Sequence, residues 1–268
     1  MYPILFEAGS VTVFSYGFMI ALGIIAGMSY LIMAGKKEVG LGFDQANTLF
    51  LLIFLAAIVG GKLFLFFEGP SHYLDNPGQL FTGRGFVFYG SFLLAIPTMW
   101  WFFKKHKLNA YKMLDVMAIT TCLVHMFGRI GCFLAGCCYG RPTNSGLGVI
   151  YSDPQCYADP LHIPLFPVQL FEALYILLVM ILLIFIRHKK KFDGQLFLTY
   201  LILYAAGRFV LEFFRGDVGR GFVIEEYVSH SQFIALCVVP VVILVYIRWS
   251  KRHRHIYAGS RPISKPPF

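Results

Sequence analysis

The sequence predicts an all-α, polytopic membrane protein with seven transmembrane helices. Of its 268 residues, 57% are hydrophobic and only 14% are charged, which is too apolar a composition for a soluble domain of this length. Seven apolar segments are each long enough to cross a hydrocarbon core of about 30 Å as a helix. They lie near residues 11–33, 46–67, 86–103, 114–134, 165–186, 196–214 and 231–249. We expect one integral-membrane domain, residues 1–268, ending in a basic tail at 250–268.

Charged and turn-forming residues separate the predicted spans. The first span is full length and no basic residue precedes it, so we expect a transmembrane anchor rather than a cleaved signal peptide. Lysines follow the first and third spans, and a basic run at 187–191 follows the fifth. The longest connections, near 68–85, 135–164 and 215–230, are rich in Gly, Pro and Asp. Such residues are typical of turns.

The distribution of basic residues predicts the orientation. Most of the 23 lysines and arginines lie in alternate connections and in the C-terminal tail, whereas the opposite loops hold only Arg84, Arg141, Arg215 and Arg220. The positive-inside rule therefore places the N-terminus outside and the C-terminus in the cytoplasm. The net charge of +9 is explained by this anchoring and indicates no nucleic-acid partner.

Polar side chains from all seven spans fall in the half of the membrane that faces outside. Buried polar groups need partners, so we expect one shared, hydrated cavity in the outer leaflet. The residues are Tyr16, Lys62, Tyr89, Arg129, Gln169, Glu172, Tyr204, Arg208, Glu212, Ser231 and Gln232.

Two arginines dominate this predicted cavity. Arg129 lies inside an apolar run, where a guanidinium is costly unless an anion or water receives it. Arg208 and Glu212 are spaced i, i+4, which favours an ion pair on one helical face together with Tyr204 and Arg215. A pair that only closes the bundle is the alternative. His125 precedes Arg129 by one turn, either as a hydrogen-bonded bundle residue or as a base.

The surplus of cations predicts an anionic ligand. Arg141, Arg215 and Lys62 join the two span arginines, whereas Glu172 and Glu212 are the carboxylates of the region. Planar guanidinium groups match the oxygens of a phosphodiester, and the surrounding spans would hold acyl chains. The pattern therefore indicates an anionic phospholipid headgroup.

Five segments in a fixed order resemble the prolipoprotein diacylglyceryl transferases of bacterial inner membranes. The family signature G-R-x-G-N-F-x-N-G-E-x-x-G corresponds to GRIGCFLAGCCYG at 128–140. SYG in the first span, GGK at 60–62, PVQLFEA at 167–173 and YAAGRFVLEFFR at 204–215 are also similar to family segments. The resemblance runs from Tyr16 to about Gln232.

The resemblance implies a reaction and its residues. Such enzymes move the diacylglyceryl group of phosphatidylglycerol to the lipobox cysteine of an exported prolipoprotein, releasing glycerol phosphate. It implies that Arg129 is the signature arginine and that Arg208 and Glu212 are the pair of the sixth span, with Tyr204 beside them. Further matched positions around the lipid are Tyr16, Gly140, Gln169 and Glu172, to which we add Arg141 and Arg215. We expect no cofactor and no metal, a monomer, and an active site facing the outer leaflet.

The chain departs from the family pattern at four positions. The family's catalytic histidine falls on Tyr89, which we expect near the lipid, and the signature residues Asn, Asn and Glu are Cys132, Ala135 and Cys137. Tyr204 and His125 are candidate replacement bases. A relative that binds anionic phospholipid without transfer is an alternative.

The cysteines allow several interpretations. Cys122 and Cys237 lie in spans and are most simply packing residues. Cys132, Cys137, Cys138 and Cys156 lie at or beyond the outer surface, where we expect a structural disulfide. The spacing CxxxxCC lacks the two-residue interval of zinc knuckles, which counts against a metal. A membrane thiol–disulfide protein that uses Cys137 and Cys138 is the remaining alternative.

Overall fold

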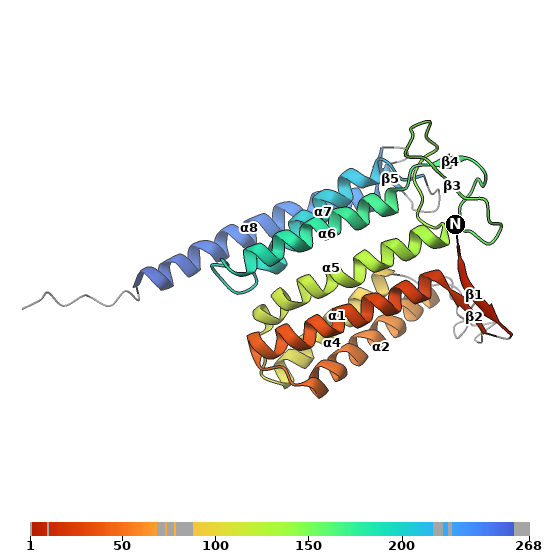
Figure 1. Cartoon of the computed structure of the whole chain (residues 1–268). Coiled ribbons are helices and arrows are strands. Elements are labelled where there is room, and N and C mark those ends of the chain that lie inside the picture. Colours follow the sequence, from red (N-terminus) through yellow and green to blue (C-terminus); the bar gives the residue numbers. More distant parts are fainter. Residues whose placement is uncertain are drawn as a thin grey trace, which may run out of the picture. The chain divides into compact units, whose positions relative to one another are not determined.

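The computed structural model describes residues 2–9, 11–68, 73, 78, 88–216, 222–224 and 227–259. Within these ranges the architecture is helical, as predicted (Figure 1). The long helices are α1 Ser15–Val39, α2 Phe43–Glu68, α4 Phe88–Lys105, α5 Ala110–Ala135, α6 Val168–Arg187, α7 Gln195–Glu212 and α8 His230–Gly259.

Six of these helices are long and apolar enough to cross a membrane, namely α1, α2, α5, α6, α7 and α8. The chain is therefore consistent with a polytopic membrane protein. Helix α4 coincides with the third expected span and contains Pro97. Seven spans and the sides of the two termini remain predictions.

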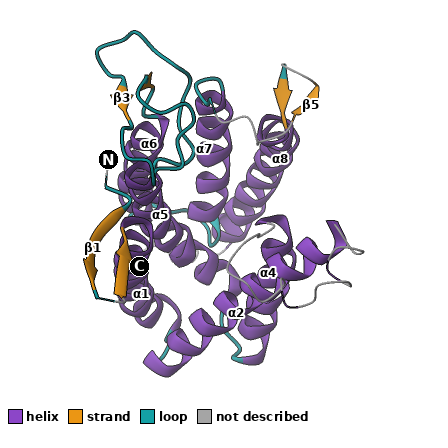
Figure 2. Cartoon of the chain, turned by 90° about the vertical axis from the view of Figure 1, so that its right-hand side faces the viewer, coloured by secondary structure: helices purple, strands orange, loops and turns teal. Residues whose placement is uncertain are grey.

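Among the described residues, three short antiparallel strand pairs that the sequence analysis did not predict lie outside the helices (Figure 2). The first pair takes four residues that we had assigned to the first span, because the three consecutive β-branched residues at 11–13 favour an extended chain. The pairs are β1 Ile4–Ala8 with β2 Val11–Phe14, β3 Val149–Ile150 with β4 Pro164–Leu165, and β5 Phe222–Ile224 with β6 Val228–Ser229.

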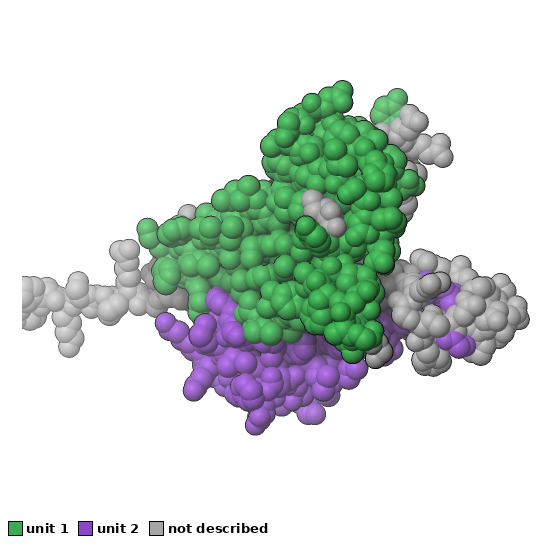
Figure 3. Space-filling model, turned by 45° about the vertical axis from the view of Figure 1, so that its right-hand side comes forward, with its two compact units in different colours: residues 1–27, 114–268 green, residues 28–113 purple. Residues whose placement is uncertain are grey.

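The chain forms two compact units, residues 28–113 and residues 1–27 with 114–268 (Figure 3). In the smaller unit α2 packs against α4, and the hydroxyl of Ser91 donates a hydrogen bond to the carbonyl of Ala57 (2.8 Å). The expectation of one integral-membrane domain stays a prediction.

In the larger unit the first half of α1 packs closely on α5. A Cβ atom at Gly23 would lie 2.9 Å from the Cβ of Phe127, and one at Gly27 would lie 2.8 Å from a methyl of Val124. This GxxxG spacing lets two helix backbones approach within a membrane. Helix α6 packs on α7, and α7 packs on α8.

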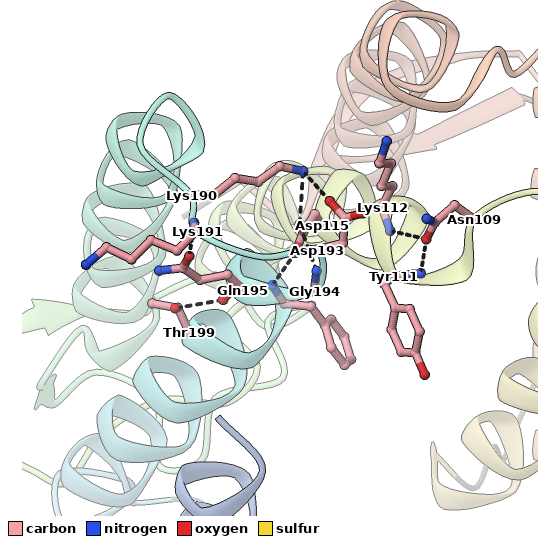
Figure 4. A network of polar contacts seen from close by, with 11 residues as sticks. Asn109, Tyr111, Lys112, Asp115, Lys190, Lys191, Asp193, Gly194, Gln195 and Thr199 are labelled. Carbon is pink, nitrogen blue, oxygen red and sulfur yellow. Dashed lines mark hydrogen bonds and ion pairs between the residues drawn. The ribbon is translucent and has the colours of Figure 1, made fainter. Parts of the chain in front are cut away.

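Asp115, near the start of α5, anchors the connection between α6 and α7 (Figure 4). Its buried carboxylate accepts hydrogen bonds from the backbone N–H groups of Gly194 (3.0 Å) and Phe197 (3.1 Å). It also pairs with Lys190 at 3.3 Å. These contacts hold the start of α7 against α5, a role that the sequence analysis missed.

Candidate functional site

Arg129 on α5 binds a carboxylate from the neighbouring helix α6. Its Nη2 lies 3.0 Å from Oε1 of Glu172, whose side chain is only 3% exposed. The Nε of Arg129 also donates a hydrogen bond to Nε2 of His125 (3.2 Å), and that nitrogen lies 3.6 Å from the same carboxylate oxygen. The lone pair of His125 Nε2 is thus already used, so the ring holds Arg129 in place. The sequence analysis placed these residues in one region but did not predict the Arg129–Glu172 pair.

Arg208 and Glu212 form the ion pair expected from their spacing. Nη2 of Arg208 lies 2.7 Å from Oε2 of Glu212, and the carboxylate side chain is 2% exposed. The other terminal nitrogen, Nη1, is buried and has no hydrogen-bond partner among the described residues. A buried guanidinium nitrogen that is not yet satisfied favours a ligand with acceptor oxygens.

Tyr204 lies one turn before Arg208 and links the two arginine–glutamate pairs. Its ring contacts that of His125 edge to face, with centroids 5.3 Å apart. It also stacks on the ring of Tyr200, with centroids 5.7 Å apart. Residues from α5, α6 and α7 therefore meet in one cluster of the larger unit, as the predicted cavity requires. Lys62 and Tyr89 belong to the smaller unit, so their predicted roles stay predictions.

Backbone hydrogen bonds join the loop after α5 to two other segments, one just before α6 and one just after α7. The N–H of Gly140 donates to the carbonyl of Phe166 (2.9 Å), and the N–H of Arg141 donates to that of Phe214 (2.9 Å). A Cβ atom at Gly140 would lie 2.4 Å from the Phe166 oxygen, so only glycine fits. Nε of Arg141 donates to the carbonyl of Arg215, whose side chain is buried. The loop thus holds two predicted cations beside the ends of α5, α6 and α7.

Gln169 fastens the same loop to α6. The fully buried side-chain amide donates to the backbone carbonyl of Cys137 (2.8 Å) and to the hydroxyl of Tyr151 (3.3 Å). Burial raises the pKa of Tyr151 to about 12, so that the hydroxyl stays neutral. The structure thus gives Gln169 a positioning role, and its contact with lipid stays a prediction. Tyr16 is 45% exposed and packs against Gly131 of α5.

All six cysteines are free thiols, so the expected structural disulfide is absent from the structure. Cys156 instead packs into a small core of the loop region with Tyr139 and Tyr151. The Sγ atoms of Cys132, Cys137 and Cys138 all lie within 4.8 Å of one another. Hydrogen bonds from the other two thiols lower the pKa of Cys138, whereas the same network raises that of Cys137.

Comparison with known proteins decides the family. The model of the family described as prolipoprotein diacylglyceryl transferase matches residues 3–248. The chain belongs to the prolipoprotein diacylglyceryl transferase family. The match includes every residue of the site described above, so the predicted family is confirmed.

Relatives from three bacteria show how much of the chain the similarity covers. A phosphatidylglycerol–prolipoprotein diacylglyceryl transferase of Clostridium tetani is 37% identical over 247 residues, 92% of this chain and 97% of that protein. An enzyme of the same name from Dehalococcoides mccartyi is 32% identical, over 91% of this chain and 92% of its own. A second such transferase of Clostridium perfringens is 34% identical, over 91% and 93% respectively. The chain is therefore similar to whole transferases rather than to a part of one.

Proposed function

We propose that the protein transfers the diacylglyceryl group of phosphatidylglycerol to the lipobox cysteine of exported prolipoproteins. The observation that carries this proposal is the pair of buried arginine–glutamate contacts, Arg129–Glu172 and Arg208–Glu212. The transferases of the three bacteria named above act on phosphatidylglycerol and prolipoproteins according to their names.

Both pairs leave guanidinium N–H groups that can bind the lipid phosphate. Each glutamate fixes one face of its guanidinium and leaves other N–H groups for a ligand, such as Nη1 of Arg208. A phosphodiester accepts these N–H groups bidentately. Arg215 and Arg141, which the loop at 136–141 holds nearby, add positive charge. The glycerol carbon to be attacked then lies next to the bound phosphate.

The chemistry is a displacement at that carbon. The sulfur of the lipobox cysteine forms a C–S bond while the C–O bond to phosphate breaks, and the electron pair of the C–O bond leaves on the phosphate oxygen. The guanidinium groups stabilise the charge that gathers there, an effect worth about 10²–10³ in rate per donor in other enzymes. The thiol must lose its proton to become the nucleophile.

We further propose that the site faces the outer leaflet of the bacterial cytoplasmic membrane and that the protein acts as a monomer. The charge distribution along the sequence supports this orientation. Arg129 near the end of α5, Glu172 near the start of α6 and Glu212 at the end of α7 share one end of their helices. The Asp115–Lys190 contact lies at the start of α5 and after α6, the opposite end.

Complementation tests the function. A bacterial strain depleted of its own transferase should regain growth and lipid-modified lipoproteins when it expresses this chain. Expression to the same level without lipidation would contradict the proposal and would favour a relative that binds lipid without transfer.

A further inference from the structure

The structure brings together three thiols whose spacing along the chain does not suggest a site. The Sγ atoms of Cys132, Cys137 and Cys138 lie within 4.8 Å of one another. Cys132 is buried and the other two are half-buried. Tetrahedral zinc with Zn–S bonds of about 2.3 Å needs sulfurs about 3.8 Å apart. The separations in the structure exceed that value by no more than about 1 Å.

The end of α5 explains why the three thiols converge. Cys132 lies in the last turn of α5, and the chain then reverses at Gly136, which has φ of 78°. The N–H of Cys137 closes this turn on the carbonyl of Cys132 (3.1 Å). Cys138 follows in a left-handed conformation with φ of 59°. The turn therefore brings three sulfurs close together, although the cysteines lack the two-residue interval of zinc knuckles.

We propose that Cys132, Cys137 and Cys138 bind a zinc ion whose fourth position takes the acceptor thiol of the prolipoprotein, an inference that rests on the proposed function. Thiolates are preferred ligands of zinc. Catalytic zinc sites use three protein ligands and leave one position open, whereas structural sites use four. Three sulfurs are thus the set expected of a catalytic site.

A zinc ion would activate the acceptor thiol, for which the altered signature supplies no evident base. The resemblance implies that Tyr89 stands where the family has its catalytic histidine, and Nε2 of His125 already accepts a hydrogen bond from Arg129. A thiol that coordinates zinc loses its proton, which passes to water, and becomes a bound thiolate. That thiolate attacks the glycerol carbon, the C–O bond to phosphate breaks, and glycerol phosphate leaves with the electron pair. The product thioether is a weaker ligand than a thiolate and is released from the metal.

Charge and position fit this assignment. Zinc with three cysteine thiolates carries one net negative charge, and a fourth thiolate adds another. Arg129 lies three residues before Cys132 on α5, and Arg215 forms a β-bridge with Gly140, two residues after Cys138. The same arginines belong to the proposed phosphate site. The zinc-bound nucleophile and the leaving phosphate are therefore held by neighbouring groups, as a displacement requires.

Metal binding can be measured without any assay of activity. The purified full-length protein, reduced and loaded with Zn²⁺, should hold one zinc per chain by elemental analysis. Co²⁺ in its place should give the intense visible and sulfur charge-transfer bands of a tetrahedral thiolate site. The substitutions Cys132→Ser and Cys138→Ser should each weaken Co²⁺ binding at least about 10-fold. Cys156→Ser and Cys237→Ser are matched controls that should bind as the wild type does. Wild-type protein without stoichiometric metal, or an unchanged Cys138→Ser variant, would overturn the zinc site.

A peptide tests the open position. A lipobox peptide should change the Co²⁺ bands when it contains cysteine, and the same peptide with serine should leave them unchanged. A cysteine peptide without effect would overturn the role of the metal in thiol activation.

The redox alternative is tested on protein isolated from native membranes, with free thiols alkylated immediately so that their oxidation state is preserved. A Cys137–Cys138 disulfide in most of the protein would also overturn the proposal.

The failure of this inference differs from that of the proposed function. Removing zinc with a chelator should lower the rate of transfer at least about 100-fold, and added Zn²⁺ should restore it. Transfer that proceeds unchanged without zinc would overturn the inference and leave the transferase function intact. Protein that gives the cobalt spectrum with Co²⁺ but transfers no lipid when it is loaded with Zn²⁺ would contradict the proposed function instead.

Discussion

The carboxylate of Glu172 on α6 pairs with the guanidinium of Arg129 on α5, with 3.0 Å between Oε1 and Nη2. One acidic side chain, 3% exposed, thus orients the arginine of the family signature. The contact joins two of the sequence segments that resemble the family, 128–140 and 167–173, at one site.

Removal of the Glu172 carboxylate should destabilise the protein. In Glu172→Ala, Arg129 becomes a buried cation without its partner, which costs about 3–5 kcal/mol. Glu172→Gln should lose less stability than Glu172→Ala, because the amide oxygen still accepts a hydrogen bond from Arg129. Thermal unfolding of the detergent-solubilised variants compares them. If Glu172→Ala unfolds at the wild-type temperature, the pair is not a source of stability.

Loss of the Gln169 amide should loosen the signature loop. Gln169→Leu leaves the carbonyl of Cys137 without its buried donor, at a cost of about 1–3 kcal/mol. Amide hydrogen exchange of residues 136–141 should accelerate in this variant. Gln155→Leu is the control, because that side chain is exposed. Equal exchange in both variants would argue against Gln169 as the anchor.

A methyl group at Gly140 should disrupt the same loop by steric contact. The added Cβ would lie 2.4 Å from the Phe166 oxygen, whereas at Gly146 nothing lies within 4 Å. Gly140→Ala should therefore reduce the yield of folded protein and the transfer rate at least about 10-fold, and Gly146→Ala should change neither. Size-exclusion yield and rate per folded molecule give the comparison. A fully active Gly140→Ala protein would show that the loop can shift.

Asp115 should matter for stability and not for chemistry. Asp115→Asn weakens the acceptor for Gly194, Phe197 and Lys190 and should cost about 1–3 kcal/mol. Asp193→Asn, at the more exposed partner of the same lysine, should cost less than about 0.5 kcal/mol. The transfer rate per folded molecule should be unchanged in both. A loss of rate in folded Asp115→Asn protein would contradict this separation.

The sequence predicted the helices and the Arg208–Glu212 pair because both follow from local patterns along the chain. Apolar length determines where helices cross, and the i, i+4 interval brings Arg208 to Glu212. The strand of residues 11–14 was missed because a short β-branched run next to a long apolar segment resembles its continuation. Asp115 was missed because its partners lie more than 70 residues away. The thiol cluster was missed because it depends on the backbone reversal at Gly136 rather than on spacing.

The central claim is that the arginine pairs serve lipid transfer, and a direct assay tests it. Purified, zinc-loaded protein with phosphatidylglycerol micelles and a lipobox peptide should yield a thioether-linked diacylglyceryl peptide by mass spectrometry, with one glycerol phosphate released per peptide. Arg208→Ala should lower this rate at least about 100-fold while the protein stays folded. Lys189→Ala, which removes an exposed cation just after α6, should match the wild type. Product at the wild-type rate from Arg208→Ala, or no product from folded wild-type protein, would contradict the account.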